Sequence, residues 1–144
     1  VSSIRLLEMT EGRSDIEIIA VDNNSEDGTA EYLKRQKTVQ SILLNENNGI
    51  AGYNQGFERA AGDYILVLDD DSCPRDIKTL DRLIALLDNN PLFGVIACHI
   101  ETPGGDPQWE WHLPQEHRFG ISPFFIGCGF AIRRRLFEKI HWYP

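Results

Sequence analysis

The sequence predicts an α/β fold with three layers, in which helices cover both faces of a mainly parallel central sheet. Segments with helical periodicity alternate with short runs rich in β-branched and apolar residues, and this alternation is typical of such a sheet. The apolar runs end in clusters of Asp, Asn and Gly, which form turns. The 144 residues, 42% hydrophobic and 25% charged, suffice for one domain with a single core.

The first half of the chain contains three predicted helices and three predicted strands. The helices have apolar residues spaced three or four apart, the first two strands are compact β-rich runs, and the third strand is uninterrupted apolar sequence, as expected for a strand buried on both faces. In order, we expect helix 1–10, strand 16–21, helix 29–37, strand 41–44, helix 50–61 and strand 64–68.

The second half begins with a strongly amphipathic helix. Helix 77–87 ends at a cluster of Asp, Asn and Pro, and strand 93–100 follows. Residues 101–123 are rich in Pro, Gly, Trp and His and have no sustained period, which indicates a long loop over a site. Strand 124–132 and helix 133–140 complete the pattern.

Charge and composition exclude several classes of protein. The 14 Lys and Arg and 22 Asp and Glu give a net charge of −8, which disfavours nucleic acid and anionic lipid surfaces as partners, so we expect at most peripheral membrane association. No apolar stretch approaches the roughly 20 residues of a membrane-spanning helix. The three cysteines are odd in number and widely spaced, so we expect reduced thiols. These features predict a soluble, cytoplasmic protein.

The acidic triplet Asp69, Asp70 and Asp71 follows the most apolar strand, at the edge of the sheet where α/β proteins bind ligands. If strand geometry continued through the triplet, Asp69 and Asp71 would leave on the same side. Two adjacent carboxylates repel unless a proton or a cation lies between them, and oxygen ligands favour Mg²⁺ or Mn²⁺. Since Mg²⁺ completes its shell with substrate phosphates, this pattern predicts a diphosphate ligand; the alternative is a solvated turn before the next helix.

Polar residues also follow the first two predicted strands. Asp22 is placed to accept hydrogen bonds from a ribose or base, or equally to form an Asx turn. Asn48 and Gly49 lie in a loop whose backbone can approach a flat ligand closely. The lysine and hydroxyl of a Walker loop are absent from this loop.

Four segments in this order resemble the family 2 nucleotide-sugar glycosyltransferases, which have the Rossmann-like GT-A fold. They are Ile18 to Thr29 (IIAVDNNSEDGT), Asn45 to Gly56 (NENNGIAGYNQG), Gly62 to Pro74 (GDYILVLDDDSCP) and Phe125 to Ile140 (FIGCGFAIRRRLFEKI). The resemblance implies transfer of a sugar from a nucleotide-diphosphate donor to an acceptor hydroxyl, assisted by Mn²⁺ or Mg²⁺ and with inversion. It also implies a role in cell-surface polysaccharide or glycolipid synthesis, with a glycan or lipid-linked acceptor, at the inner face of the membrane.

The resemblance assigns roles to particular residues. Asp71, together with Asp69, would hold the metal as a DXD motif; Asp69 would lie near the ribose or sugar, and Asp22 would contact the nucleoside. The glycines from Gly127 to Gly129 would border the donor sugar and the acceptor. The full predicted set of donor contacts is Asp22, Asn24, Asn48, Gly49, Asn54, Asp69, Asp70, Gly127 and Gly129.

The chain departs from the family pattern at both ends. We expect a single domain over residues 1–144 that lacks the family's first strand and the region that carries the catalytic base and contacts the acceptor. The family's acidic base follows the last helix, so we expect it beyond Pro144. Acidic residues of the long loop, such as Glu101, are interpreted as solvent-facing side chains.

Two other functions fit parts of the sequence. One is a non-catalytic or degenerate domain that binds a sugar nucleotide. The other is a phosphatase with Asp69 as the nucleophile, because Asp69 and Asp71 have the required spacing; the expected downstream lysine motif is not evident. The basic cluster Arg133 to Arg135 could meet an anionic ligand, although at a helix start we favour a solvated face.

Overall fold

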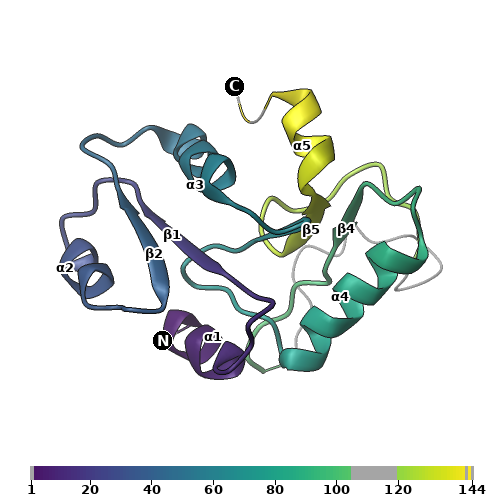
Figure 1. Cartoon of the computed structure of the whole chain (residues 1–144), viewed down its shortest axis with the longest axis horizontal. Helices are drawn as coiled ribbons and strands as arrows, with labels where there is room; N and C mark the ends of the chain where they lie inside the picture. Colours follow the sequence, from purple (N-terminus) through teal and green to yellow (C-terminus); the bar gives the residue numbers. More distant parts are fainter. Residues whose placement is uncertain (1, 105–119, 142, 144) are drawn as a thin grey trace. The chain divides into compact units, whose positions relative to one another are not determined.

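The computed structural model describes residues 2–104, 120–141 and 143 (Figure 1). The chain divides into two compact units. The first unit comprises Val1–Glu11 and Leu66–Arg133, and the second comprises Gly12–Ile65 and Arg134–Pro144. The chain passes from the second unit to the first within strand β3 (Tyr64–Val67). A single domain over residues 1–144 stays a prediction.

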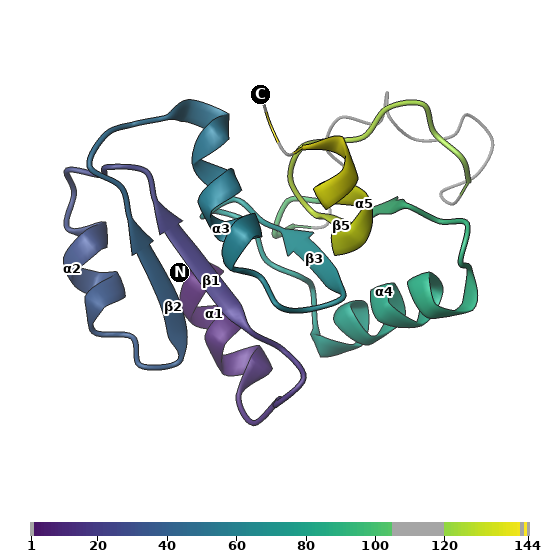
Figure 2. The same cartoon turned by 45° about the horizontal axis from the view of Figure 1, so that its top comes forward.

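The second unit contains a β-α-β segment. Strand β1 (Ile18–Asp22) pairs in parallel with β2 (Val39–Leu43), and helix α2 (Thr29–Lys34) connects them. The register places Ile18 opposite Val39 and Asp22 opposite Leu43. The two arrows in Figure 2 accordingly point the same way, so the loops that follow both strands leave from one edge.

Aromatic side chains form a cluster in the second unit. The cluster joins α3 (Tyr53–Arg59), which directly follows the short helix η1 (Gly49–Gly52), to helix α5 (Arg134–Ile140). The rings of Phe57 and Phe137 meet edge to face with centroids 4.5 Å apart, and Tyr143 lies 5.7 Å from Phe137. Phe57 and Phe137 are buried, and edge-to-face packing is a favoured aromatic geometry. The cluster therefore anchors α5 and Tyr143 on α3.

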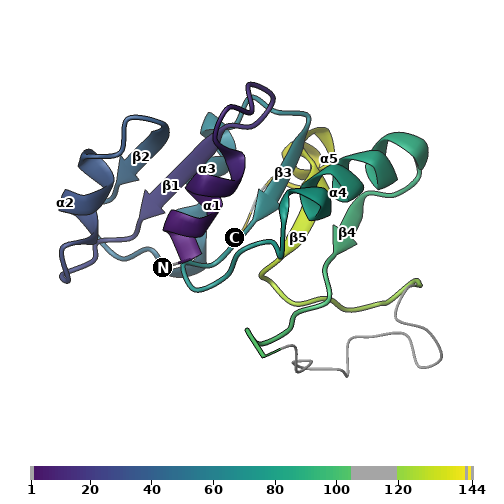
Figure 3. The same cartoon turned by 90° about the horizontal axis from the view of Figure 1, so that it is seen from below.

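The first unit is built on a three-stranded sheet with the order β3, β5, β4 (Figure 3). Strands β4 (Val95–Ala97) and β5 (Phe130–Arg133) are antiparallel. The α/β class is confirmed, because helices alternate with strands as the periodicity predicts. The mainly parallel central sheet is not confirmed: the described strands form a two-stranded parallel sheet and a three-stranded sheet with an antiparallel pair.

Helix α4 (Ile77–Asn89) forms much of the first unit's core, and α1 (Ser2–Thr10) belongs to the same unit. The buried side chains of α4 lie on one face of the helix, as its sequence period predicts. They are Leu80, Leu83 and Leu87.

In the basic cluster Arg133 to Arg135, two of the three arginines bind main-chain carbonyls. Arg133 donates to the carbonyls of Asn90 (3.1 Å) and Phe93 (2.8 Å), beyond the end of α4. Arg134 donates to the Gly62 carbonyl (2.8 Å) and pairs with Glu138 (2.6 Å). The interpretation as a solvated face was wrong for these two residues, because their guanidinium groups satisfy main-chain carbonyls.

The predicted elements are present with changed boundaries: α4 runs two residues further than predicted, to Asn89, whereas the two later strands are shorter than predicted. The predicted strand 93–100 is shortened to Val95–Ala97 because the Phe93 amide donates to Asn90 (2.9 Å) in a turn. The predicted strand 124–132 begins only at Phe130, and the Phe124 amide bonds instead to the Ser122 hydroxyl. Most of the predicted long loop lies outside the described residues.

Two further expectations concern the membrane and the cysteines. Within the described ranges, no helix combines the length and the apolar character that crossing a membrane requires. Cys73, Cys98 and Cys128 are free thiols, as expected.

The core position of Leu87 yields a stability prediction. Leu87 is fully buried, so Leu87→Ala should lower the free energy of unfolding by about 2–5 kcal/mol through lost burial and a residual cavity. Leu92→Ala is the matched control, because Leu92 is 97% exposed, and should change it by less than about 0.5 kcal/mol. Urea denaturation followed by circular dichroism measures both; equal effects would contradict the assigned core.

Candidate functional site

The edge where β1 ends holds Asp22 in a defined turn. The Asp22 carbonyl accepts from the Leu44 amide (2.9 Å), and its carboxylate Oδ1 accepts from the Ser25 amide (3.2 Å). Asp22 is 4% exposed, and Asn24, within the turn, is exposed with a left-handed φ of 67°. The Asx-type turn, one of the two alternatives for Asp22, is therefore present. Contact of Asp22 and Asn24 with a nucleoside stays a prediction.

Asn23 connects the loops that follow β1 and β2. Its Nδ2 donates to Asn47 Oδ1 (3.0 Å) and to the Gly49 carbonyl (3.0 Å), and its Oδ1 accepts from the Asn48 amide (2.9 Å). The structure thus brings Asp22 and Asn24 together with Asn48 and Gly49 at one edge. The sequence analysis does not include Asn23 in the site. The sequence signal that could have identified Asn23 is its position directly after a predicted strand, next to Asp22.

Small residues allow the second loop to approach Asn23. Gly49 has a left-handed φ of 55°, and its amide donates to Asn47 Oδ1 (2.9 Å). A Cβ on Gly52 would lie 3.0 Å from Asn23 Oδ1. Glycine at these positions therefore permits the conformation and the close contact on which the edge depends.

Asn54 has a structural partner inside the second unit. Its Nδ2 donates to the Tyr143 carbonyl (2.9 Å), and its Oδ1 accepts from the Tyr143 amide (3.0 Å). The side chain thus binds Tyr143 as a neighbouring strand would. The role of Asn54 in donor binding stays a prediction.

The N-terminus of α2 follows the same edge. Asp27 Oδ1 accepts from the Thr29 hydroxyl (2.6 Å) and the Thr29 amide (3.1 Å). These hydrogen bonds, the side-chain bond foremost, hold the pKa of Asp27 below its ordinary value. A carboxylate at this place also complements the helix dipole.

The acidic triplet of the first unit lies in a turn and not in a strand. Strand β3 ends at Val67, and the Ser72 amide donates to the Asp69 carbonyl (3.1 Å). The Ser72 hydroxyl accepts from the Asp69 amide (2.9 Å) and donates to its carbonyl (2.9 Å). The premise that Asp69 and Asp71 alternate as strand residues was wrong, because these bonds close a turn. All three carboxylates are exposed.

The glycine-rich stretch adjoins β3. The Gly129 amide donates to the Val67 carbonyl (2.8 Å), and the Gly129 carbonyl accepts from the Cys98 amide (2.8 Å). Gly129 has a φ of 69°, and a Cβ there would lie 2.8 Å from Ile100 Cδ1. The structure thus brings Gly129 to the end of β3 that carries the acidic turn, while Gly127, two residues earlier, is exposed.

Cys98 lies beside this stretch as a free thiol. Burial raises its pKa, and nearby Cys128 raises it further. A raised pKa lowers the thiolate fraction at neutral pH, which agrees with a structural thiol and not a nucleophile.

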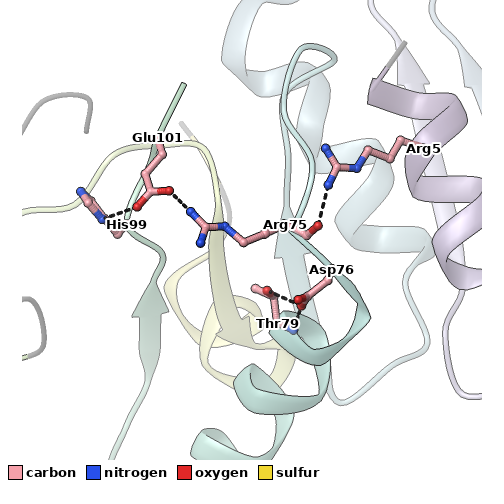
Figure 4. Close-up of polar contacts among 6 residues, drawn as sticks. All are labelled: Arg5, Arg75, Asp76, Thr79, His99 and Glu101. Carbon is pink, nitrogen blue, oxygen red and sulfur yellow. Dashed lines mark hydrogen bonds and ion pairs between the residues drawn. The ribbon is translucent and has the colours of Figure 1, made fainter. Parts of the chain in front are cut away.

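Glu101 lies at the same end of the sheet, beyond β4. Its carboxylate pairs with the Arg75 guanidinium through one oxygen and lies 3.4 Å from His99 Nδ1 through the other (Figure 4). Its side chain is 24% exposed. The interpretation of Glu101 as a solvent-facing acid was therefore wrong.

The acidic turn suits a divalent cation by the chemistry of its ligands. It presents adjacent exposed carboxylates, which are hard oxygen ligands. Within residues 2–104, 120–141 and 143, no group of three or more His, Cys, Asp or Glu side chains is placed to hold a metal ion. Asp69 and Asp71 would therefore supply only part of the ligands of a bound cation.

The chain belongs to glycosyl transferase family 2, whose family model matches residues 2–141. It is 28% identical over 120 residues to TuaG of Bacillus subtilis (strain 168), whose name describes a glycosyltransferase of teichuronic acid biosynthesis. That match covers 78% of this chain and 48% of TuaG. An uncharacterized protein of Haemophilus influenzae (strain ATCC 51907 / DSM 11121 / KW20 / Rd) is 30% identical over 138 residues, 86% of this chain and 75% of that protein.

Solved structures share the fold. The mannosyltransferase PcManGT from Pyrobaculum calidifontis, in complex with GDP-Man and Mn²⁺, superposes with a TM-score of 0.80 at 22% identity over 99% of this chain and 42% of that one. TarS 1-349 of S. aureus gives 0.74 at 19% identity, over 98% of this chain and 45% of that one. This chain therefore spans less than half the length of TuaG and of both solved chains. The expected glycosyltransferase-type α/β fold is confirmed.

The contacts of Asn23 yield a prediction for the edge of the second unit. Asn23→Ala removes three hydrogen bonds and should lower the free energy of unfolding by about 1–2 kcal/mol. The Asn48 amide should then exchange its hydrogen faster. Asn45→Ala, at an exposed position in the same loop, is the control and should change neither quantity. Denaturation and amide exchange by NMR check the result, and an unchanged Asn48 exchange rate would contradict the assigned bond.

Proposed function

We propose that this chain is the donor-binding part of a glycosyltransferase that moves a sugar from a nucleotide diphosphate to an acceptor hydroxyl. The observation that carries the proposal is the family match over residues 2–141, within which the acidic turn follows β3 directly. The shared fold supports it, because PcManGT is solved with GDP-Man and Mn²⁺ and TarS with UDP.

The acidic turn is the proposed binding site for the donor diphosphate and a divalent cation. Asp71 and Asp69 would hold Mn²⁺ or Mg²⁺, and Asp70 would lie beside the donor. The cation, when bound, supplies positive charge that offsets the charge of the leaving nucleoside diphosphate. Ser72 shapes this part of the chain, since its hydroxyl and amide close the turn.

The other predicted residues would contact the rest of the donor. In the second unit, Asp22, Asn24, Asn48 and Gly49 would bind the nucleoside, and their common edge supports this. In the first unit, Gly127 and Gly129 would border the donor sugar, and the bond from Gly129 to Val67 supports this.

The acceptor side of the proposed reaction requires a catalytic base. An acidic base beyond Pro144 would take the proton of the acceptor hydroxyl. The acceptor oxygen would then form a bond to the anomeric carbon with inversion, while the bond from that carbon to the diphosphate breaks and the nucleoside diphosphate leaves. We propose a glycan or lipid-linked acceptor of cell-surface polysaccharide synthesis, at the inner face of the membrane; the name of TuaG supports this class.

Donor binding is tested by thermal denaturation with UDP-, GDP- and dTDP-sugars, with and without Mn²⁺. A saturating donor at about 100 times its Kd stabilises by about 2.7 kcal/mol, which corresponds to a rise in Tm of about 5–10 °C. We expect one nucleotide class to raise Tm only with Mn²⁺, and Asp71→Asn to abolish the rise because it removes a metal ligand.

Asp63→Asn is the matched control, since it removes an exposed carboxylate just before β3, at the strand's opposite end. Its response should equal that of the unaltered chain. Binding that needs no metal and survives Asp71→Asn would refute the proposed cation site. Donor binding by a longer natural chain that turns over no acceptor would instead favour the non-catalytic alternative.

A further inference from the structure

Asn54 uses both polar atoms of its side chain on one residue, Tyr143. Its Nδ2 donates to the Tyr143 carbonyl (2.9 Å), and its Oδ1 accepts from the Tyr143 amide (3.0 Å), although 89 positions separate the two residues in the sequence. Both residues are half-buried and belong to the second unit. Because the two bonds come from one planar amide group, they fix both the position and the direction of the main chain at Tyr143.

The ring of Tyr143 is held by the two helices of the aromatic cluster. Its centroid lies 5.8 Å from that of Phe57 and 5.7 Å from that of Phe137, and both of these side chains are buried. Tyr53, the residue before Asn54, lies 6.3 Å from it in an edge-to-face arrangement. The segment after α5 is therefore held twice, by its backbone through Asn54 and by its ring through aromatic packing.

The chain changes direction directly after α5. His141 follows Ile140, the last residue of the helix, and has a left-handed φ of 64°. Residues other than glycine keep this conformation only where the surrounding structure holds it. The bonds from Asn54 reach the chain two residues later, at Tyr143. Asn54 is therefore placed to decide the course that the main chain takes after α5.

We propose that Asn54 is a positioning residue of the transfer reaction, which fixes the course of the chain after α5, and that it is not a contact of the donor. The inference rests on the proposed function, in which the catalytic base lies beyond Pro144, so that the chain leading to the base passes through Tyr143. The sequence predicts Asn54 as a donor contact instead. The two roles differ in their effects: loss of a donor contact weakens donor binding, whereas loss of a positioning residue slows the reaction of bound donor.

The test compares turnover with donor binding in Asn54→Ala. Turnover is the release of nucleoside diphosphate by the longer natural chain, from whichever UDP-, GDP- or dTDP-sugar raises its Tm. Water serves as the acceptor: the base takes its proton, and its oxygen bonds to the anomeric carbon as the nucleoside diphosphate leaves. We expect kcat per folded enzyme to fall about ten- to a hundredfold, because a small displacement of a reacting group costs that much. The KM for the donor should change less than about twofold.

A second readout follows the contact itself. Asn54→Ala should speed amide hydrogen exchange at Tyr143, because the amide loses its acceptor. Gln55→Ala is the matched control, since it removes the next side-chain amide of α3 at an exposed position. It should leave kcat, KM and the exchange rate of Tyr143 unchanged.

Two other variants keep the test decisive if Asn54→Ala does not fold. Asn54→Asp retains the size of the side chain and the acceptor for the Tyr143 amide but removes the donor to its carbonyl. Tyr143→Ala removes the ring and leaves Asn54 unaltered. Both should lower kcat with little change in KM. The double variant Asn54→Ala/Tyr143→Ala should be little slower than the slower single variant, because both changes release the same segment.

The outcomes separate this inference from the function on which it rests. A raised donor KM with unchanged kcat in Asn54→Ala would make Asn54 a donor contact and overturn the positioning role. An unchanged kcat and KM per folded enzyme would reduce the contact to a purely structural one and overturn it as well. If the unaltered longer chain binds donor but releases no nucleoside diphosphate, the proposed transfer fails and the positioning role fails with it.

Discussion

The parallel register of β1 and β2 is the constraint on which the polar edge of the second unit depends. A parallel pair sends both following loops out at one edge, whereas an antiparallel pair would separate them. Asn23 then uses its amide three times across the two loops. These bonds fix the backbone around Asn48 and Gly49.

In the first unit, main-chain hydrogen bonds of Gly129 hold the segments at one end of the sheet together. The main chain of Gly129 links Val67 of β3 to Cys98, which follows β4. This places the residues that follow β3 and β4 at the same end as the glycine-rich stretch. The acidic turn after β3 and Glu101 after β4 therefore lie at the same end of one sheet, although Asp71 and Glu101 are 30 positions apart in the sequence.

Three arginines of the described residues organise main-chain carbonyls. Arg133 and Arg134 bind carbonyl groups, and Arg5 holds the carbonyl of Arg75. Guanidinium groups suit this use because they offer several fixed donors. The chain as a whole carries a net charge of −8.

The sequence by itself determined the order and type of nearly all elements, because periodicity and turn residues act locally. It also determined the family, because four motifs in a fixed order identify it. Only the tertiary structure decided that the acidic triplet forms a turn, that Asn23 joins two loops, and that Glu101 faces Arg75. The contacts of Asn23 and Glu101 join residues about 25 positions apart, and composition and spacing along one chain do not encode which side chains such pairing brings into contact. The acidic turn is closed locally by Asp69 and Ser72, but the sequence fits either a continued strand or a turn at this point, and the structure decided between the two.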